Sequence, residues 1–272
     1  MISLFKEAKN WLLLFFLCAI STYSQDILWE KSFGGKNSEY LFDAIPTPDY
    51  GFILAGSSIS GKEGSKTNEN KGNYDYWVWK MTEKGDLDWQ KSFGGSADDH
   101  LQSIRLTNDG GFILAGISNS PKDGDKKEDN KGQSDFWLIK LDAKGGEIWQ
   151  RTIGGNGLEN LYSIAPTSDG GYIIGGTSSS DKSPNNLSGK EDKFGKTDAS
   201  FGNLDYWVIK LNASGNIIWQ KTYGGIYADE LRSIEPTKDG GYIIGGYSNS
   251  PKSGNKTDDN FGEGDYWILK LD

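Results

Sequence analysis

One unit of sequence recurs four times along the chain, and this repetition restricts the fold more than any other feature. A tryptophan shortly before a Gly-Gly pair returns at spacings of 60, 60 and 70 residues, at Trp29, Trp89, Trp149 and Trp219. Two aspartates keep the same spacings, one in an Asp-Tyr-Gly or Asp-Gly-Gly turn and one before an aromatic pair: Asp49, Asp109, Asp169 and Asp239; Asp75, Asp135, Asp205 and Asp265. The third copy carries a ten-residue insertion around residues 185–192. Tandem copies of one unit predict a repeat architecture.

Each copy has the pattern of four short strands. In the second copy we expect strands at residues 102–107, 111–118, 135–141 and 147–153, with polar turns containing glycine at 108–110 and 142–145. Short strands separated by such turns at even spacing are typical of radial β repeats, and no segment shows a sustained helical period. The sequence therefore predicts an all-β fold, a β-propeller of four four-stranded blades.

The two ends of the repeat region predict how the ring closes. The region begins at residues 27–33 with a segment like the last strand of a repeat, and it ends at residues 265–271 with a third strand. We expect the N-terminal strand to pair with residues 265–271 and complete the last blade, because a closed ring leaves no exposed sheet edge. Trp29 is then expected in the same environment as its three counterparts.

The repeat resembles a family of bacterial secreted β-propeller repeats. The resemblance rests on the segments IIWQKTYGG, SIEPT, DGGYIIGGYSNS and DYWILKLD, and it covers residues 27–272. It implies a propeller fold and export, as in bacteria that use type IX secretion, but no single activity. It also extends to quinone-dependent propeller enzymes, for which four repeats are few.

The N-terminal 25 residues have the order of a secretory signal peptide, which leaves residues 26–272 as the propeller domain. Lys6 and Lys9 precede an apolar run at residues 11–20, and a short polar stretch follows. We expect cleavage near Ser24 or Gln25 and a secreted, periplasmic or cell-surface protein. Cys18, the one cysteine, lies within the apolar run and suits a lipoprotein anchor poorly. No other segment is apolar enough to cross a membrane, and the net charge of −9 disfavours nucleic acid as a partner.

Propeller connectivity places the long loops between the second and third strands on one face, where binding is expected. An acid recurs there after each Gly-Gly pair, together with paired serines and one lysine per loop. The candidate binding residues are the four acids, the unrepeated Trp79 and the single histidine: Glu39, Asp99, Glu159, Asp229, Trp79 and His100. Turn capping by these polar side chains is the alternative interpretation of the repeated acids and serines.

Chemistry at this face has little support in the sequence. No cofactor is required, although calcium is possible because carboxylates and carbonyls in Asp- and Asn-rich loops suit it. The repeated mid-strand tryptophans are expected in the core, whereas Trp79 is the better candidate for exposure. The sequence predicts a non-enzymatic module that binds a protein or a glycan. A polysaccharide hydrolase or lyase acting at the same face is the alternative, since paired acids suit that chemistry.

Overall fold

The computed structural model describes residues 25–183 and 192–272, and the chain divides into the compact units Met1–Ser32 and Phe33–Asp272. Nearly all of the predicted signal peptide and most of the third-copy insertion lie outside the described residues. The described chain has no helix with the length and hydrophobicity that crossing a membrane requires.

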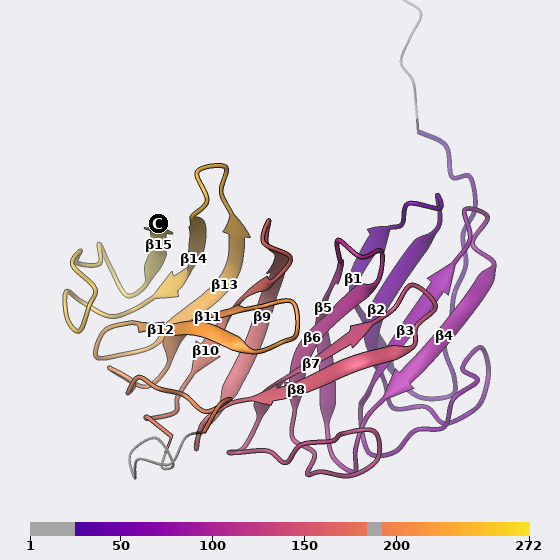
Figure 1. Cartoon of the computed structure of the whole chain (residues 1–272), viewed down its shortest axis with the longest axis horizontal. Helices are drawn as coiled ribbons and strands as arrows, with labels where there is room; N and C mark the ends of the chain where they lie inside the picture. Colours follow the sequence, from indigo (N-terminus) through magenta and orange to yellow (C-terminus); the bar gives the residue numbers. More distant parts are fainter. Residues whose placement is uncertain (1–24, 184–191) are drawn as a thin grey trace, which may run out of the picture. The chain divides into compact units, whose positions relative to one another are not determined.

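Four antiparallel sheets account for all the described strands (Figure 1). The first sheet contains β1 (Glu39–Pro46), β2 (Phe52–Ser58), β3 (Asp75–Met81) and β4 (Leu87–Phe93). The second contains β5 (Asp99–Leu106), β6 (Phe112–Ser118), β7 (Asp135–Leu141) and β8 (Glu147–Ile153). The third contains β9 (Glu159–Pro166), β10 (Tyr172–Ser178), β11 (Asp205–Leu211) and β12 (Ile217–Tyr223). The fourth contains β13 (Asp229–Pro236), β14 (Tyr242–Ser248) and β15 (Asp265–Leu271). Each sheet corresponds to one sequence repeat, as predicted.

Within a sheet the strands follow chain order and are joined by short turns or long loops. Gly110 and Gly145 occupy the turns with φ of 80° and 77°, a backbone conformation that glycine adopts without a steric penalty. The predicted third and fourth strands of the second copy match β7 and β8. The first strand, β5, begins three residues earlier than predicted, because its ladder with β6 starts at Asp99 opposite Ser118. A bulge between Leu101 and Ser103 interrupts the alternation from which the strand was predicted.

Consecutive sheets pack against one another through apolar faces. Each sheet has two faces. We call the face that packs on the next sheet in the chain the rear face, and the other face of the same sheet the front face. The contact between one sheet's rear face and the next sheet's front face is called a junction. At the first junction the rear face of the first sheet meets the front face of the second: Ile53, Ala55, Tyr76, Val78 and Phe93; Leu101, Ile104, Phe112, Leu114, Trp137, Ile139 and Leu141. The second and third junctions use equivalent residues. The apolar core of the described residues therefore consists of three similar layers between sheets and a smaller cluster of Trp77, Trp79 and Met81 on the front face of the first sheet.

The predicted closure of the ring is not formed in this structure. Residues 27–33 form no strand, and among the described residues β15 pairs only with β14, so the fourth sheet has three strands. No packing comparable to the three junctions joins the fourth sheet to the first within the described chain. Trp29 is 40% exposed and therefore does not share the half-buried environment of Trp89, Trp149 and Trp219. The physical reason is that, among the described residues, no sheet packs on the rear face of the fourth sheet, so the junction that would hold an outer strand beside β15 is missing.

Candidate functional site

The four recurring acids lie where the first strand of each sheet begins, next to the long loops. Asp99, Glu159 and Asp229 are fully buried, and Glu39 is half-buried. The carboxylate of Asp99 accepts hydrogen bonds from Gly95 N at 2.8 Å and from Ser120 Oγ at 2.9 Å. Asp229 repeats both bonds, with Gly225 N and Ser250 Oγ. These acids thus connect the Gly-Gly turn to the long loop, which is the turn-capping interpretation.

A buried lysine holds each long loop from within. Lys126 Nζ donates to Ser120 O at 2.7 Å and also to Asn130 Oδ1. Lys66 Nζ makes the same pair of bonds, with Ser60 O and Asn70 Oδ1. Burial is the main cause that lowers the pKa of Lys126, to about 8. The repeated lysines therefore shape the loops, and they are too buried to meet a macromolecule.

Each junction brings two acids together beneath the loops. Asp135, at the start of β7, approaches Glu159 of the next sheet, and its pKa rises to about 7, first because of burial and then because of that neighbouring acid. Asp75 has its pKa raised to about 6 by burial, and the charge of Asp99 adds to the effect. One oxygen of Asp135 accepts from Lys131 N at 2.5 Å. A Cβ at Gly154 would overlap with the other oxygen, which explains why the motif needs glycine at its first position.

Calcium binding by the long loops has no geometric support in the described residues. Among them no group of three or more His, Cys, Asp or Glu side chains is arranged to hold a metal ion. The Asp123 carboxylate of the DGDKKEDN run instead accepts a hydrogen bond from Ser96 N at 2.9 Å. Asp129 and Glu128 of the same run likewise accept from backbone N–H groups, of Lys122 and Thr152.

A second repeated network, which the sequence did not reveal as such, lies at the opposite end of the sheets. Thr107 Oγ1 donates to Asp109 Oδ1 at 2.5 Å, and the buried Lys140 Nζ donates to the same oxygen at 3.0 Å. The other sheets repeat the arrangement with Asp49, Asp169 and Asp239. The repeated Asp in the turn and Lys in the third strand were the available signal. This network fixes the short turns and occupies their aspartates and lysines.

Trp79 does not have the exposure that was expected for a binding residue. It is 6% exposed, and its ring lies 4.2 Å from that of Phe33 and 5.5 Å from that of Trp77. The mid-strand tryptophans of the third strands are buried as expected, and Trp137 and Trp207 are fully covered. Trp79 lies on the front face of the first sheet. Its burial was not predicted, because a tryptophan that occurs in only one repeat gives no repeated pattern from which burial could be inferred.

His100 belongs to a cluster of rings at the loop end of β1 and β5. Its ring centroid lies 5.0 Å from that of Tyr74, which lies 5.8 Å from that of Tyr40, which in turn lies 6.3 Å from that of Phe42. Tyr40 and Phe42 are exposed, whereas Tyr74 and His100 are half-buried. We call these four residues the aromatic cluster. Two of its rings, Tyr40 and Phe42, remain available to a ligand at the predicted loop face.

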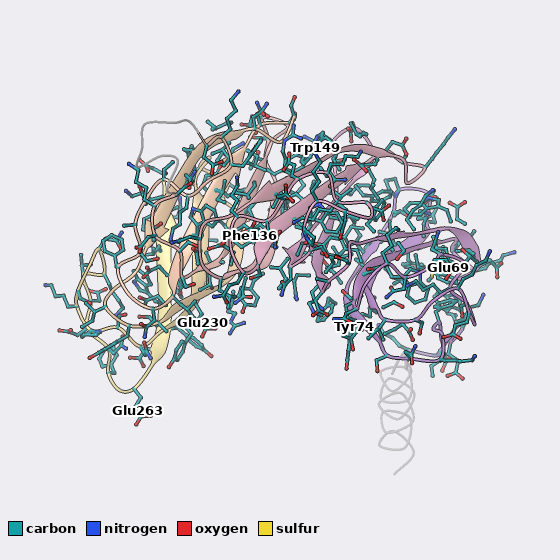
Figure 2. The ribbon with its side chains drawn as sticks, turned by 90° about the horizontal axis from the view of Figure 1, so that it is seen from below. Glu69, Tyr74, Phe136, Trp149, Glu230 and Glu263 are labelled. Atoms are coloured by element: carbon teal, nitrogen blue, oxygen red, sulfur yellow. The ribbon has the colours of Figure 1, made fainter. Side chains whose placement is uncertain are left out.

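The first strands carry side chains that differ between repeats at equivalent positions. Tyr40, His100, Asn160 and Glu230 occupy one such position, and Phe42, Gln102, Tyr162 and Arg232 occupy another. Arg232 lies 4.3 Å above the ring of Tyr162 and donates to the Glu230 carboxylate at 2.5 Å. In Figure 2 Tyr74 and Glu230 are both labelled below Phe136, at about the same height in the view. Positions that vary within otherwise constant repeats were the signal for these residues, and the sequence reasoning did not use it.

No family model matches the chain. Over 186 residues the chain is 26% identical to Regulatory protein FlaEY of Caulobacter vibrioides, a match that covers 65% of this chain and 19% of that protein. A protein of unknown function from Bacteroides caccae is similar in structure, with 14% identity, a TM-score of 0.37, and coverage of 80% of this chain and 74% of the other. A glucose dehydrogenase matches with 13% identity, a TM-score of 0.32, and coverage of 88% and 84%. At these TM-scores neither solved structure informs the site.

Proposed function

We propose that this protein is an exported, non-enzymatic module that binds a glycan or a protein through its long-loop face. The observation that carries the proposal is the aromatic cluster, in which exposed rings stand beside a face whose repeated acids are all engaged internally. Flat rings next to polar groups suit a ligand with both apolar and hydroxylated surfaces. Among the two partners, the stacked rings favour a glycan.

Export is part of the same proposal. The basic start and the apolar run at residues 11–20 support delivery out of the cytoplasm, where glycans and surface proteins are accessible. The four sheets are proposed to act as blades of a propeller, a rigid scaffold that holds loops and first-strand side chains at one end.

A hydrolase or lyase at the same face has less support. The paired carboxylates that polysaccharide cleavage needs must contact the sugar, but Asp135, Glu159 and their counterparts Asp99 and Asp229 are fully buried. Burial is the first cause of the raised pKa values of Asp135 and Asp99.

Binding to a glycan array by the purified protein tests the proposal. Replacing Tyr40 and Tyr74 by alanine is expected to lower the affinity for any glycan bound at least about tenfold, or about 1.4 kcal/mol. Tyr50→Ala is the matched control, because Tyr50 is 79% exposed but lies in the short turn between β1 and β2 at the other end of the sheet.

Three outcomes decide between the partners. A glycan that requires Tyr40 and Tyr74 but not Tyr50 supports the glycan arm. A surface protein that is captured with the same dependence supports the protein arm. Binding of either kind that is unaffected by Tyr40→Ala and Tyr74→Ala, or turnover of a polysaccharide, contradicts the proposal.

A further inference from the structure

The rear face of the fourth sheet exposes residues that the other rear faces bury. Tyr266 is 92% exposed and Ile268 is 63% exposed. The equivalent Tyr76 and Tyr206 are fully buried: each ring packs on a tryptophan of the next sheet, with centroids 4.8 and 4.9 Å apart. Each hydroxyl also donates to that tryptophan's carbonyl at 3.0 Å. Within the part of the chain that the structure describes, the fourth sheet therefore presents a junction surface on which no other sheet packs.

The front face of the first sheet has already begun such a junction. Phe33 packs on Trp79, which occupies the position equivalent to Ile139, and Phe93 belongs to the same apolar cluster as Ile139. Leu41, by contrast, is 62% exposed although its equivalent Leu101 is fully buried. The front face of the first sheet thus has a fragment of a preceding blade on it and lacks the rest.

Hydrogen bonds place that fragment in the position of a fourth strand's end. Gly34 O accepts from Ser65 N at 2.9 Å, as Gly94 O accepts from Asp125 N at 2.9 Å. Asn37 N donates to Ser60 Oγ at 3.0 Å, and the second repeat has the same bond at the same length, from Ala97 N to Ser120 Oγ. Residues 33–37 consequently stand before the first sheet as 93–97 stand before the second.

The fourth sheet lacks the strand that this fragment would continue. In the third sheet Val208 pairs with Lys221 and Lys210 pairs with Trp219. Transferred by the repeat spacing, this register sets Lys31 opposite Ile268 and Trp29 opposite Lys270. It also sets Glu30 where Gln90, Gln150 and Gln220 accept the indole N–H of the neighbouring tryptophan at 3.1 Å. Residues 27–33 therefore match the missing strand in pattern and in hydrogen-bonding chemistry.

We propose that a second copy of this chain covers the rear face of the fourth sheet, front face to rear face, so that two copies close into one ring. In each half of the ring, residues 27–33 of one copy would add to β15 of the other. The occupant is inferred from the three internal junctions, because the two uncovered faces have the sequences of the two halves of a fourth such junction. Those junctions bury fully packed side chains and hold four sheets in succession without bringing the fourth onto the first. A second copy completes the ring without altering them, and eight blades lie within the range of known propellers.

The acid pairs beneath the loops extend the same pattern. Asp75 meets Asp99 at the first junction, and Asp135 meets Glu159 at the second. Asp205 faces Asp229 at the third junction. The fourth member of the series would join Asp265 of one copy to Glu39 of the other. Both residues are half-buried here, in contrast to Asp135 and Glu159, which have no exposed surface.

Molar mass as a function of concentration, measured by light scattering on a sizing column, tests the assembly. The purified protein is expected at twice its chain mass of 30.0 kDa, or of the processed chain, at tens of micromolar. Ile268→Asp is expected to convert it to a monomer with unchanged circular dichroism. Ile148→Asp is the control, since Ile148 is exposed on β8 and outside any junction face, and it should leave the dimer intact. A monomer at every concentration overturns the proposal, as does an open polymer.

An engineered disulfide distinguishes a second copy from closure within one chain. Lys31→Cys and Ile268→Cys are combined with Cys18→Ser, and air oxidation is followed on a non-reducing gel. A product of twice the chain mass supports the proposal. Quantitative oxidation at the mass of one chain shows that the chain closes on itself and overturns the proposal. Lys31→Cys with Ile218→Cys is the control, because Ile218 faces solvent on β12 and is expected to give no comparable yield.

Discussion

The three internal junctions and the uncovered faces at the two ends contain nearly the same residues in different surroundings. Tyr76 and Tyr206 are buried on a tryptophan of the next sheet, whereas Tyr266, at the same place in its repeat, is 92% exposed. Leu101 is buried and Leu41 is not. The difference shows that burial belongs to the junction and not to the blade. A single repeat has two apolar faces and can bury them only against neighbours.

The largest expected effect is the difference in stability between two equivalent substitutions, one at a tyrosine buried in a junction and one at its exposed counterpart. Tyr76→Ala removes a buried ring and its hydrogen bond to Trp137 O, and it is expected to lower the free energy of unfolding by about 3–5 kcal/mol. Tyr266→Ala, in protein dilute enough to be monomeric, is expected to change it by less than about 0.5 kcal/mol. Urea unfolding followed by circular dichroism measures both values.

Equal losses for the two tyrosines in dilute protein would contradict the comparison, since they would mean that Tyr266 is buried within one chain. A loss at Tyr266 that appears only at high concentration is the result that assembly predicts, because binding of a second copy stabilises the folded state by mass action.

A smaller effect is expected in the pH dependence of stability, because the aspartates at the two ends of the sheets have pKa values shifted in opposite directions. Burial and Glu159 raise the pKa of Asp135 to about 7. The folded state is therefore most stable, as far as this carboxyl is concerned, below about pH 4, the ordinary pKa of an aspartate. That stability is lost as the pH rises through about 7. Lys80 and Thr47 lower the pKa of Asp49 to about 2, so its contribution is present above about pH 4 and is lost as the pH falls toward 2. Together these groups predict an optimum of stability in mildly acidic solution.

Asp135→Asn tests this assignment. The variant keeps an acceptor for Lys131 N but cannot ionise. In the unaltered protein the free energy of unfolding is expected to fall by on the order of 2 kcal/mol between pH 5 and pH 8 because of this carboxyl, and the variant should not show that fall. Asp49→Asn is the control, and its pH dependence should have the opposite sign. It is expected to lower the free energy of unfolding at neutral pH and to have little effect near pH 2. Thermal unfolding across the pH range measures both variants. An unchanged slope in Asp135→Asn would show that this carboxyl does not govern the pH dependence.

Much of the fold followed from repetition, because each strand and turn is specified locally. The strands at residues 135–141 and 147–153 were predicted correctly from turn glycines and alternation. Asp99 was predicted as a binding residue, with turn capping as the alternative, and it is buried and bonded to Gly95 N and Ser120 Oγ. The exposure expected for Trp79 was wrong, because whether the front of the first sheet is covered depends on Phe33 and not on the third strand itself. Closure at residues 27–33 depends on which sheets meet, and no local pattern encodes that. The aromatic cluster was missed apart from His100, since attention went to residues that repeat.

Amide hydrogen exchange in β15, with β11 as its internal reference, tests the central claim most directly. Both strands have the same place in their repeats, but β11 is paired on both sides with β10 and β12, whereas among the described strands β15 pairs only with β14. At high protein concentration the amides of Asp265–Leu271 are predicted to become as protected as those of Asp205–Leu211, and on dilution they should exchange far faster while β11 is unchanged. Protection of β15 that does not depend on concentration, or its absence at every concentration, would contradict closure by a second copy.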